Sequence, residues 1–217
     1  MSQIIPQLAP MIIGLLLSPI PIIALIIILM TDHAQINGQA FVGGWLLGIF
    51  GVGLIVISFP GLVPNSDTPS AYAGTIRISL GLTLICWAVY KAYRRYHTPS
   101  ADIPRFFQKL DQITASRAFV LGLLVSAGNI KNLGFSAAAA VVITQADLSF
   151  FSRLSHLLAY SLVGSMTVLI PLGLYFCQRH KADAMLLNWK TWLIGNHTYV
   201  LSAVVIFVGV MIMTGGK

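Results

Sequence analysis

The sequence predicts an all-α integral membrane protein of six transmembrane helices, arranged as two inverted three-helix repeats. Three observations predict it. Of the 217 residues, 57% are hydrophobic and only 9% are charged, against roughly 45–50% and about 25% in soluble domains. Six apolar runs are long enough to cross a membrane, and two helix-interrupting stretches recur at matching places. The composition argues against a soluble enzyme, and we expect no catalytic activity, cofactor or metal site.

The six apolar runs, numbered here as spans one to six, approach or exceed the ~20 residues that a helix needs to cross a bilayer. They lie at residues 5–30, 38–59, 72–93, 117–143, 151–177 and 197–214. Little chain remains outside them, so we expect a single polytopic membrane domain over 1–217. Repeat one covers 1–93, a cytoplasmic linker covers 94–116 and repeat two covers 117–217.

The distribution of positive charge predicts the orientation. The chain has 13 Lys and Arg residues and a net charge of +7, and most of these cations flank the connections after spans three and five. They are Lys91, Arg94, Arg95, Arg105, Lys109, Arg117, Arg179, Lys181 and Lys190. The positive-inside rule places these connections in the cytoplasm and both termini outside. Cations beside apolar runs contact anionic lipids, so we expect no nucleic-acid partner.

Two connections have the pattern of helices that lie on a membrane surface. Apolar residues between Asp102 and Ile113 follow helical spacing, with Arg105 and Lys109 on the polar side. The stretch from Leu186 to Leu193 contains Trp189 and Trp192, and tryptophan is enriched at membrane interfaces. Either segment could alternatively be a simple spacer.

A short internal repeat relates spans one and four. Gly14-Leu-Leu-Leu-Ser18 recurs as Gly122-Leu-Leu-Val-Ser126, 108 residues later in a chain of 217. Directly after the matched Ser, span one has Pro19 and Pro21, and span four has Gly128-Asn129. Proline removes a helical hydrogen bond and Gly-Asn favours turns, so we expect both helices to break near the membrane midplane.

Paired breaks in inverted repeats indicate the central site of a transporter. The alternative is that the two prolines only bend span one, which membrane helices tolerate. Lys131 favours a site. It lies about thirteen residues from either end of span four, or roughly 20 Å, and an ionisable residue at that depth is functional by default. A re-entrant hairpin over 117–143 would leave five crossings and violate the charge rule, so six crossings are preferred.

The chemistry of the core indicates an anionic or zwitterionic substrate. All six acidic residues are Asp, and none lies in the middle of a span. Lys131 therefore lacks a carboxylate partner, and a cationic substrate would lack a carboxylate ligand. Ser18, Ser126, Asn129 and Asn132 offer neutral hydrogen bonds, while Pro19 and Pro21 free backbone groups. Arg77 either guides an anion or extends to the membrane surface.

Span two is rich in small residues. Gly43, Gly44, Gly48, Gly51 and Gly53 include the Gly-x-x-x-Gly spacing that lets helices pack closely. Packing within the chain is the preferred interpretation, and a homodimer interface is the alternative. Within this span, Trp45-Leu-Leu-Gly48 resembles Ser161-Leu-Val-Gly164 of span five.

Ser18-Pro-Ile-Pro-Ile22, Gly44-Trp45 and Gly128-Asn-Ile-Lys-Asn-Leu133 resemble the lysine-exporter superfamily, and within it the glycopeptidolipid-addressing and sulfolipid-addressing proteins. The resemblance covers nearly the whole chain. The family pattern has Asn-Pro-Lys in span four, where this chain has Asn129-Ile130-Lys131.

That resemblance implies a multi-pass exporter of amphipathic lipids in the bacterial inner membrane. The wider superfamily implies efflux of amino acids or inorganic cations. Because no carboxylate lies in the middle of a span, we favour the lipid and predict transport of an anionic lipid by alternating access. One alternative is an exporter of small amino acids or other zwitterions. Another is a non-transporting scaffold that binds lipid-synthesis enzymes.

Overall fold

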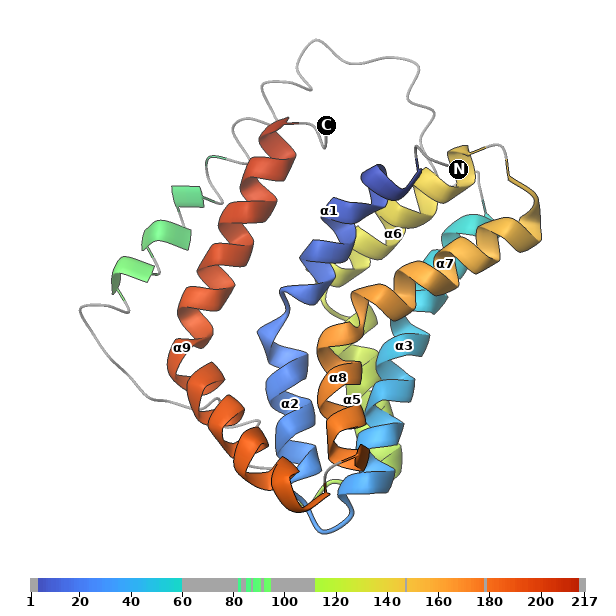
Figure 1. Ribbon diagram of the computed structural model, residues 1–217. Coiled ribbons are helices and arrows are strands. Elements are labelled where there is room, and N and C mark those ends of the chain that lie inside the picture. Colours follow the sequence, from blue (N-terminus) through green and yellow to red (C-terminus); the bar gives the residue numbers. More distant parts are fainter. Residues whose placement is uncertain are drawn as a thin grey trace.

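The structure is a computed structural model, and it describes residues 4–59, 82, 85–86, 88–90, 92–94, 112–146, 148–177 and 179–214. Within these ranges the regular elements are helices, which confirms the all-α prediction. Their bounds are α1 (Ile4–Leu16), α2 (Pro19–Leu29), α3 (Ala34–Ser58), α5 (Ala115–Ala127), α6 (Ile130–Gln145), α7 (Phe150–Gly164), α8 (Met166–Cys177) and α9 (Arg179–Thr214) (Figure 1). Arg77 and almost all of the predicted surface helix at 102–113 lie outside the described residues.

By length and composition, α3 is the single described helix that could cross a membrane unbroken. Three pairs of consecutive helices are long and apolar enough to cross a membrane only when the two helices of each pair are counted as one bent span. The bends are 50° between α1 and α2, 67° between α5 and α6, and 66° between α7 and α8. The described part of the chain thus offers up to four spans, and the six crossings and inverted repeats stay predictions.

The first bend lies at Ser18, where the sequence predicts it. Pro19 is the first residue of α2 and has no amide hydrogen for the carbonyl of Leu15, so α1 cannot continue through it. The backbone of Ser18 is extended, at φ −110° and ψ 97°. A proline at the first position of a helix has a suitable φ and lacks only a hydrogen bond that this position does not make.

The second bend confirms the predicted break in span four and forms without proline. Gly128 directly follows α5, and Asn129 directly precedes α6 in an extended conformation, at φ −87° and ψ 113°. The Asn129 side chain accepts a hydrogen bond from the backbone amide of Lys131 at 3.0 Å. An asparagine cap of this kind satisfies an amide that the helix leaves free, so it can start a new helix here.

A third bend, at Ser165, is absent from the sequence predictions. It follows Gly164, and Gly/Ser pairs are among the known causes of sharp helix kinks. The indole Nε1 of Trp45 in α3 donates to the Ser165 hydroxyl at 2.9 Å, and both side chains are buried. This hydrogen bond ties the bend to the neighbouring helix.

The connection predicted at Arg179 to Asn196 is helical, as the pattern of residues 186–193 suggested. It forms one helix with the predicted sixth span, α9, which begins at Arg179. Leu186 and Leu193 are buried against the rest of the protein. A position of this stretch on a membrane surface stays a prediction.

The two halves of the predicted fourth span extend toward opposite ends of the helix bundle (Figure 1). The turn between α2 and α3 lies beside the start of α5, where the Asn37 side chain donates to the Ile113 carbonyl at 2.7 Å. The end of α6 lies at the opposite end of the bundle, near the N-terminus (Figure 1). A bend of 67° carries α6 onward rather than back, so 117–143 is not a hairpin in this structure.

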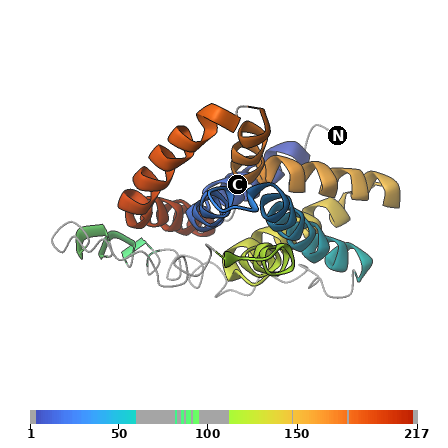
Figure 2. The ribbon, with the colours of Figure 1, turned by 90° about the horizontal axis from the view of Figure 1, so that it is seen from below.

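The glycines of α3 pack against α5 inside the chain. A Cβ at Gly44 would overlap the Phe119 carbonyl oxygen, and one at Gly48 would overlap the Ser126 hydroxyl. From the other side, a Cβ at Gly122 would overlap the Phe41 carbonyl. The two helices lie side by side when viewed along the bundle (Figure 2). Packing within the chain is thus the role of Gly44 and Gly48.

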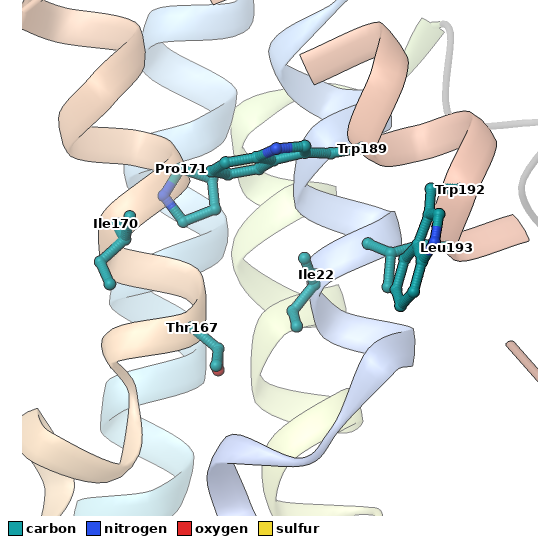
Figure 3. A pocket seen from close by; sticks show the side chains of 7 residues that line it. All are labelled: Ile22, Thr167, Ile170, Pro171, Trp189, Trp192 and Leu193. Atoms are coloured by element: carbon teal, nitrogen blue, oxygen red, sulfur yellow. The ribbon is translucent and has the colours of Figure 1, made fainter. Parts of the chain in front are cut away.

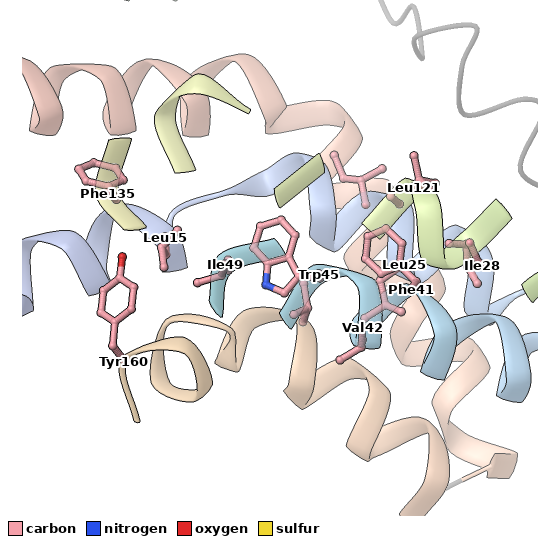
Figure 4. Packing of buried hydrophobic residues seen from close by; sticks show 14 of the residues in the cluster. Leu15, Leu25, Ile28, Phe41, Val42, Trp45, Ile49, Leu121, Phe135 and Tyr160 are labelled. Carbon is pink, nitrogen blue, oxygen red and sulfur yellow. The ribbon is translucent and has the colours of Figure 1, made fainter. Parts of the chain in front are cut away.

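A continuous apolar core joins the helices, with Trp45 between a group around Phe135 and a group around Phe41 (Figure 4). Large apolar side chains also cover the outside. Ile130 is 88% exposed and Phe151 is 80% exposed. Broad apolar exposure of this kind marks a surface that contacts something other than water, and a membrane protein has such a surface on its lipid-facing side.

Candidate functional site

The two predicted breaks are joined by the side chain of Lys131. Its ammonium nitrogen, Nζ, donates to the carbonyl oxygen of Gly14 at 2.7 Å and to the Ser18 hydroxyl at 2.6 Å. Gly14 and Ser18 belong to the break in span one, and Lys131 belongs to the break in span four. A single side chain therefore connects the two matched segments of the chain.

A second layer of hydrogen bonds holds this contact in place. The Ser18 hydroxyl donates to Asn132 Oδ1 at 3.3 Å, and Asn132 Nδ2 donates to the Val125 carbonyl at 3.2 Å. Ser18 and Asn132 are buried and Lys131 is half-buried. We name the Gly14 carbonyl, Ser18, Asn129, Lys131 and Asn132 the break cluster.

The break in α1 itself supplies the negative end that attracts Lys131. The last four carbonyls of a helix have no partner within the helix, and together they carry a partial negative charge. Gly14 lies two residues before Leu16, the last residue of α1, and its carbonyl accepts a hydrogen bond from Nζ. The ammonium thus caps a helix that ends inside the bundle.

No carboxylate neutralises Lys131 in the described part of the structure. Asp32 is the one acidic residue whose side chain is described, and it lies in the turn after α2. The 11 residues of α2 separate that turn from Ser18, which is about 16 Å along the helix. The charge of Lys131 is therefore balanced only by dipoles within this part of the chain.

The ring of Phe135 completes the surroundings of the ammonium. Its centroid lies 5.8 Å from Nζ, within the range of a cation–π contact. A Cβ at Gly14 would overlap this ring, so glycine is needed for the close approach of α1 and α6. Figure 4 shows Phe135 beside Leu15 and Tyr160.

Two further buried hydroxyls lie beside Phe135 without a hydrogen bond of standard geometry. They belong to Ser136 on α6 and Tyr160 on α7, and they lie near each other. Buried polar groups are rarely left unpaired. The two hydroxyls are thus placed to pair with each other next to the break cluster.

The predicted site residues take different places in the structure. Ser18, Lys131 and Asn132 meet directly, and Asn129 orients Lys131 by capping α6. Pro19 and Pro21 are buried in the first turn of α2. The Ser126 hydroxyl instead donates to the Gly122 and Leu123 carbonyls of its own helix and packs on Gly48, so it serves helix packing.

Sequence reasoning missed two members of this region, the Gly14 carbonyl and Phe135. A sequence signal was present only for Phe135. It lies four residues after Lys131 on α6, and residues four apart share one helix face. Backbone carbonyls have no residue-type signature, which is why Gly14 was not expected as a partner.

The break cluster is suited to binding an anion. An ammonium has three N–H donors, and two of those of Lys131 are engaged by Gly14 and Ser18. One donor and an unpaired positive charge remain. An anionic oxygen would gain a charge-assisted hydrogen bond there, which is about twice as strong as a neutral one.

The family model described as Sap, sulfolipid-1-addressing protein, matches residues 8–217. The chain belongs to this family. No match was found among curated proteins or solved structures. Membership of the sulfolipid-1-addressing family and the apolar helices are compatible with a lipid-related membrane protein.

Proposed function

We propose that the protein is a multi-pass exporter of the inner membrane that moves an anionic amphipathic lipid outward by alternating access. The observation that carries the proposal is the contact of Lys131 Nζ with Gly14 and Ser18 at 2.7 and 2.6 Å. It places a cation between two broken helices, with no carboxylate partner among the described residues. An unwound helix segment with free backbone groups is the form that substrate sites take in such transporters.

The mechanism follows from competition for the ammonium. In the described state, Lys131 binds its own chain and holds the two breaks together. An anionic headgroup attracts the same ammonium, which weakens the bonds to the Gly14 carbonyl and the Ser18 hydroxyl. A ligand shifts a conformational equilibrium only by its differential affinity for the two states, and this exchange of partners supplies such a difference.

Reciprocal packing supports the inverted repeat that alternating access needs. Gly48 of α3 packs on Ser126 of the broken span four, and Gly164 of α7 packs on Leu15 of the broken span one. Gly48 and Gly164 end the matched segments of spans two and five. Each repeat thus places its glycine against the broken helix of the other.

The proposal includes a place in the wider lysine-exporter superfamily, an inner-membrane location and an orientation with both termini outside. Family membership and the absence of core carboxylates support an anionic lipid over a cationic solute. We keep two competing functions as outcomes of the test: export of small zwitterions, and a scaffold for lipid-synthesis enzymes. If the contact of Lys131 with Gly14 and Ser18 only holds the helices together and the protein transports nothing, the scaffold is the function that remains.

The test uses the full chain reconstituted in phosphatidylcholine vesicles. Movement between leaflets is followed for acyl-labelled phosphatidylglycerol, which is anionic, and for acyl-labelled phosphatidylcholine, which is zwitterionic. Uptake of labelled alanine is measured in parallel. We expect protein-dependent movement of phosphatidylglycerol to exceed that of phosphatidylcholine. Lys131→Met should reduce it about tenfold or more, the rate equivalent of losing a charged hydrogen bond.

Arg117→Met is the matched control, because Arg117 is an exposed cation on the same span outside the break cluster. It should leave phosphatidylglycerol movement unchanged. Alanine uptake without lipid movement would replace the lipid by a small zwitterion. Folded protein that moves none of the three compounds would favour the scaffold and overturn the proposal.

A further inference from the structure

An apolar cavity of about 480 Å³ lies between α2, α8 and α9. Its walls include Ile22 from α2, Thr167 and Pro171 from α8, and Trp189, Trp192 and Leu193 from α9 (Figure 3). None of the described lining residues is charged. The volume is in the range of small-molecule sites, roughly 300–1,000 Å³, and the apolar character of these walls favours an alkyl chain over a headgroup or an ion.

The cavity begins close to the break cluster. Ile22 follows Ser18 by four residues, which is about one helical turn, or about 6 Å along α2. Ser18 accepts the hydrogen bond from Lys131 at 2.6 Å. A cationic polar site at Ser18 is therefore followed, four residues later, by an apolar one at Ile22. This arrangement matches a molecule with an anionic head and an alkyl tail.

One polar atom in the wall lacks a partner. The Thr167 hydroxyl is buried and makes no hydrogen bond. Pro171 lies four residues later inside α8 and has no amide hydrogen for the Thr167 carbonyl. Both polar groups of Thr167 are thus left without their usual helical partners. A buried hydroxyl without a partner calls for a ligand or an ordered water.

From these observations we infer that the cavity binds an acyl chain of the transported lipid, with the Thr167 hydroxyl donating a hydrogen bond to the ester carbonyl of that chain. The inference rests on the proposed function and deepens it. The aromatic walls agree with this occupant, because Trp189 and Trp192 can cover the chain with apolar surface.

The test is photolabelling of the full chain in nanodiscs with phosphatidylglycerol that carries a diazirine in one acyl chain, followed by peptide mapping. We expect labels on α2, α8 and α9. Ile22→Trp fills the cavity and should reduce these labels about tenfold. Ile20→Trp is the matched control, because Ile20 is 38% exposed on the same helix and lies outside the lining; it should leave the labels unchanged.

Two further arms separate this inference from the proposed function. Thr167→Val removes the hydroxyl at nearly constant volume and should lower labelling by the ester lipid to the level of its ether-linked analogue. Diacylglycerol with the same diazirine has no charge, so its labels should persist in Lys131→Met. Labels spread evenly over the outer surface and unaffected by Ile22→Trp would overturn the acyl-chain site, even if Lys131 still selected anionic lipid in transport.

Discussion

Lys131 caps the end of a helix that is 117 residues away in the chain, with its Nζ atom 2.7 Å from the Gly14 carbonyl oxygen. The contact connects a helix end created by one break with a side chain placed by the other. Neither break alone would produce it. The energetics of this contact can be measured without knowledge of the substrate.

Ser18 and Lys131 should be coupled energetically. A double-mutant cycle of Ser18→Ala and Lys131→Met, measured by unfolding of the purified protein in micelles, should give an interaction energy of about 1 kcal/mol, because the two residues share a hydrogen bond. Ser155 is the control, since its hydroxyl is exposed and bonds within α7. Ser155→Ala should be additive with Lys131→Met, and additivity of the Ser18 pair would refute the contact.

Ile130→Pro should preserve the fold. Ile130 is the first residue of α6, its side chain is 88% exposed, and proline is tolerated at a first helical position. Asn129 already has the extended backbone that a following proline requires. We expect the apparent melting temperature to stay within a few degrees of the parent protein.

The matched control for that substitution is Leu133→Pro, three residues further along α6. The Leu133 amide donates to the Asn129 carbonyl at 2.9 Å, and proline would remove this bond at a cost of about 3 kcal/mol. If both variants unfolded at the same temperature, the start of α6 would have to lie elsewhere.

Gly48 and Gly51 should respond in opposite ways to alanine. A Cβ at Gly48 would overlap the Ser126 hydroxyl, while a Cβ at Gly51 would meet nothing within 4 Å. Thermal unfolding should show destabilisation of roughly 1–3 kcal/mol for Gly48→Ala and stabilisation of up to about 1 kcal/mol for Gly51→Ala. Adding Ser126→Gly to Gly48→Ala should recover part of the loss. Equal effects at both glycines would contradict the packing of α3 on α5.

Ser165→Ala should destabilise the protein by about 1–3 kcal/mol, because it leaves the buried Nε1 of Trp45 without an acceptor. Denaturant unfolding followed by tryptophan fluorescence measures this loss, and the emission of Trp45 should shift as its hydrogen bond is removed. Ser155→Ala serves again as an exposed control. A neutral Ser165→Ala would mean that the bend between α7 and α8 does not depend on Trp45.

The sequence by itself determined the helical class and the two breaks around Ser18 and Asn129. These follow from local chemistry. Proline lacks an amide hydrogen, and Asn129 caps the next helix with its own side chain, so neighbouring residues suffice to end one helix and begin another. The sequence likewise marked Lys131 as exceptional, because a cation in the middle of an apolar run is unusual however the helices pack.

Only the tertiary structure decided what these features contact. The bend at Ser165 is hydrogen-bonded to Trp45, which is 120 residues away, and Leu186 and Leu193 of α9 are buried against the rest of the protein. The acceptor for Lys131 is a backbone carbonyl, which every residue has, so no pattern of residue types could single out Gly14. Contacts between distant residues and with backbone groups are set by how the helices pack. Local sequence patterns do not predict that packing.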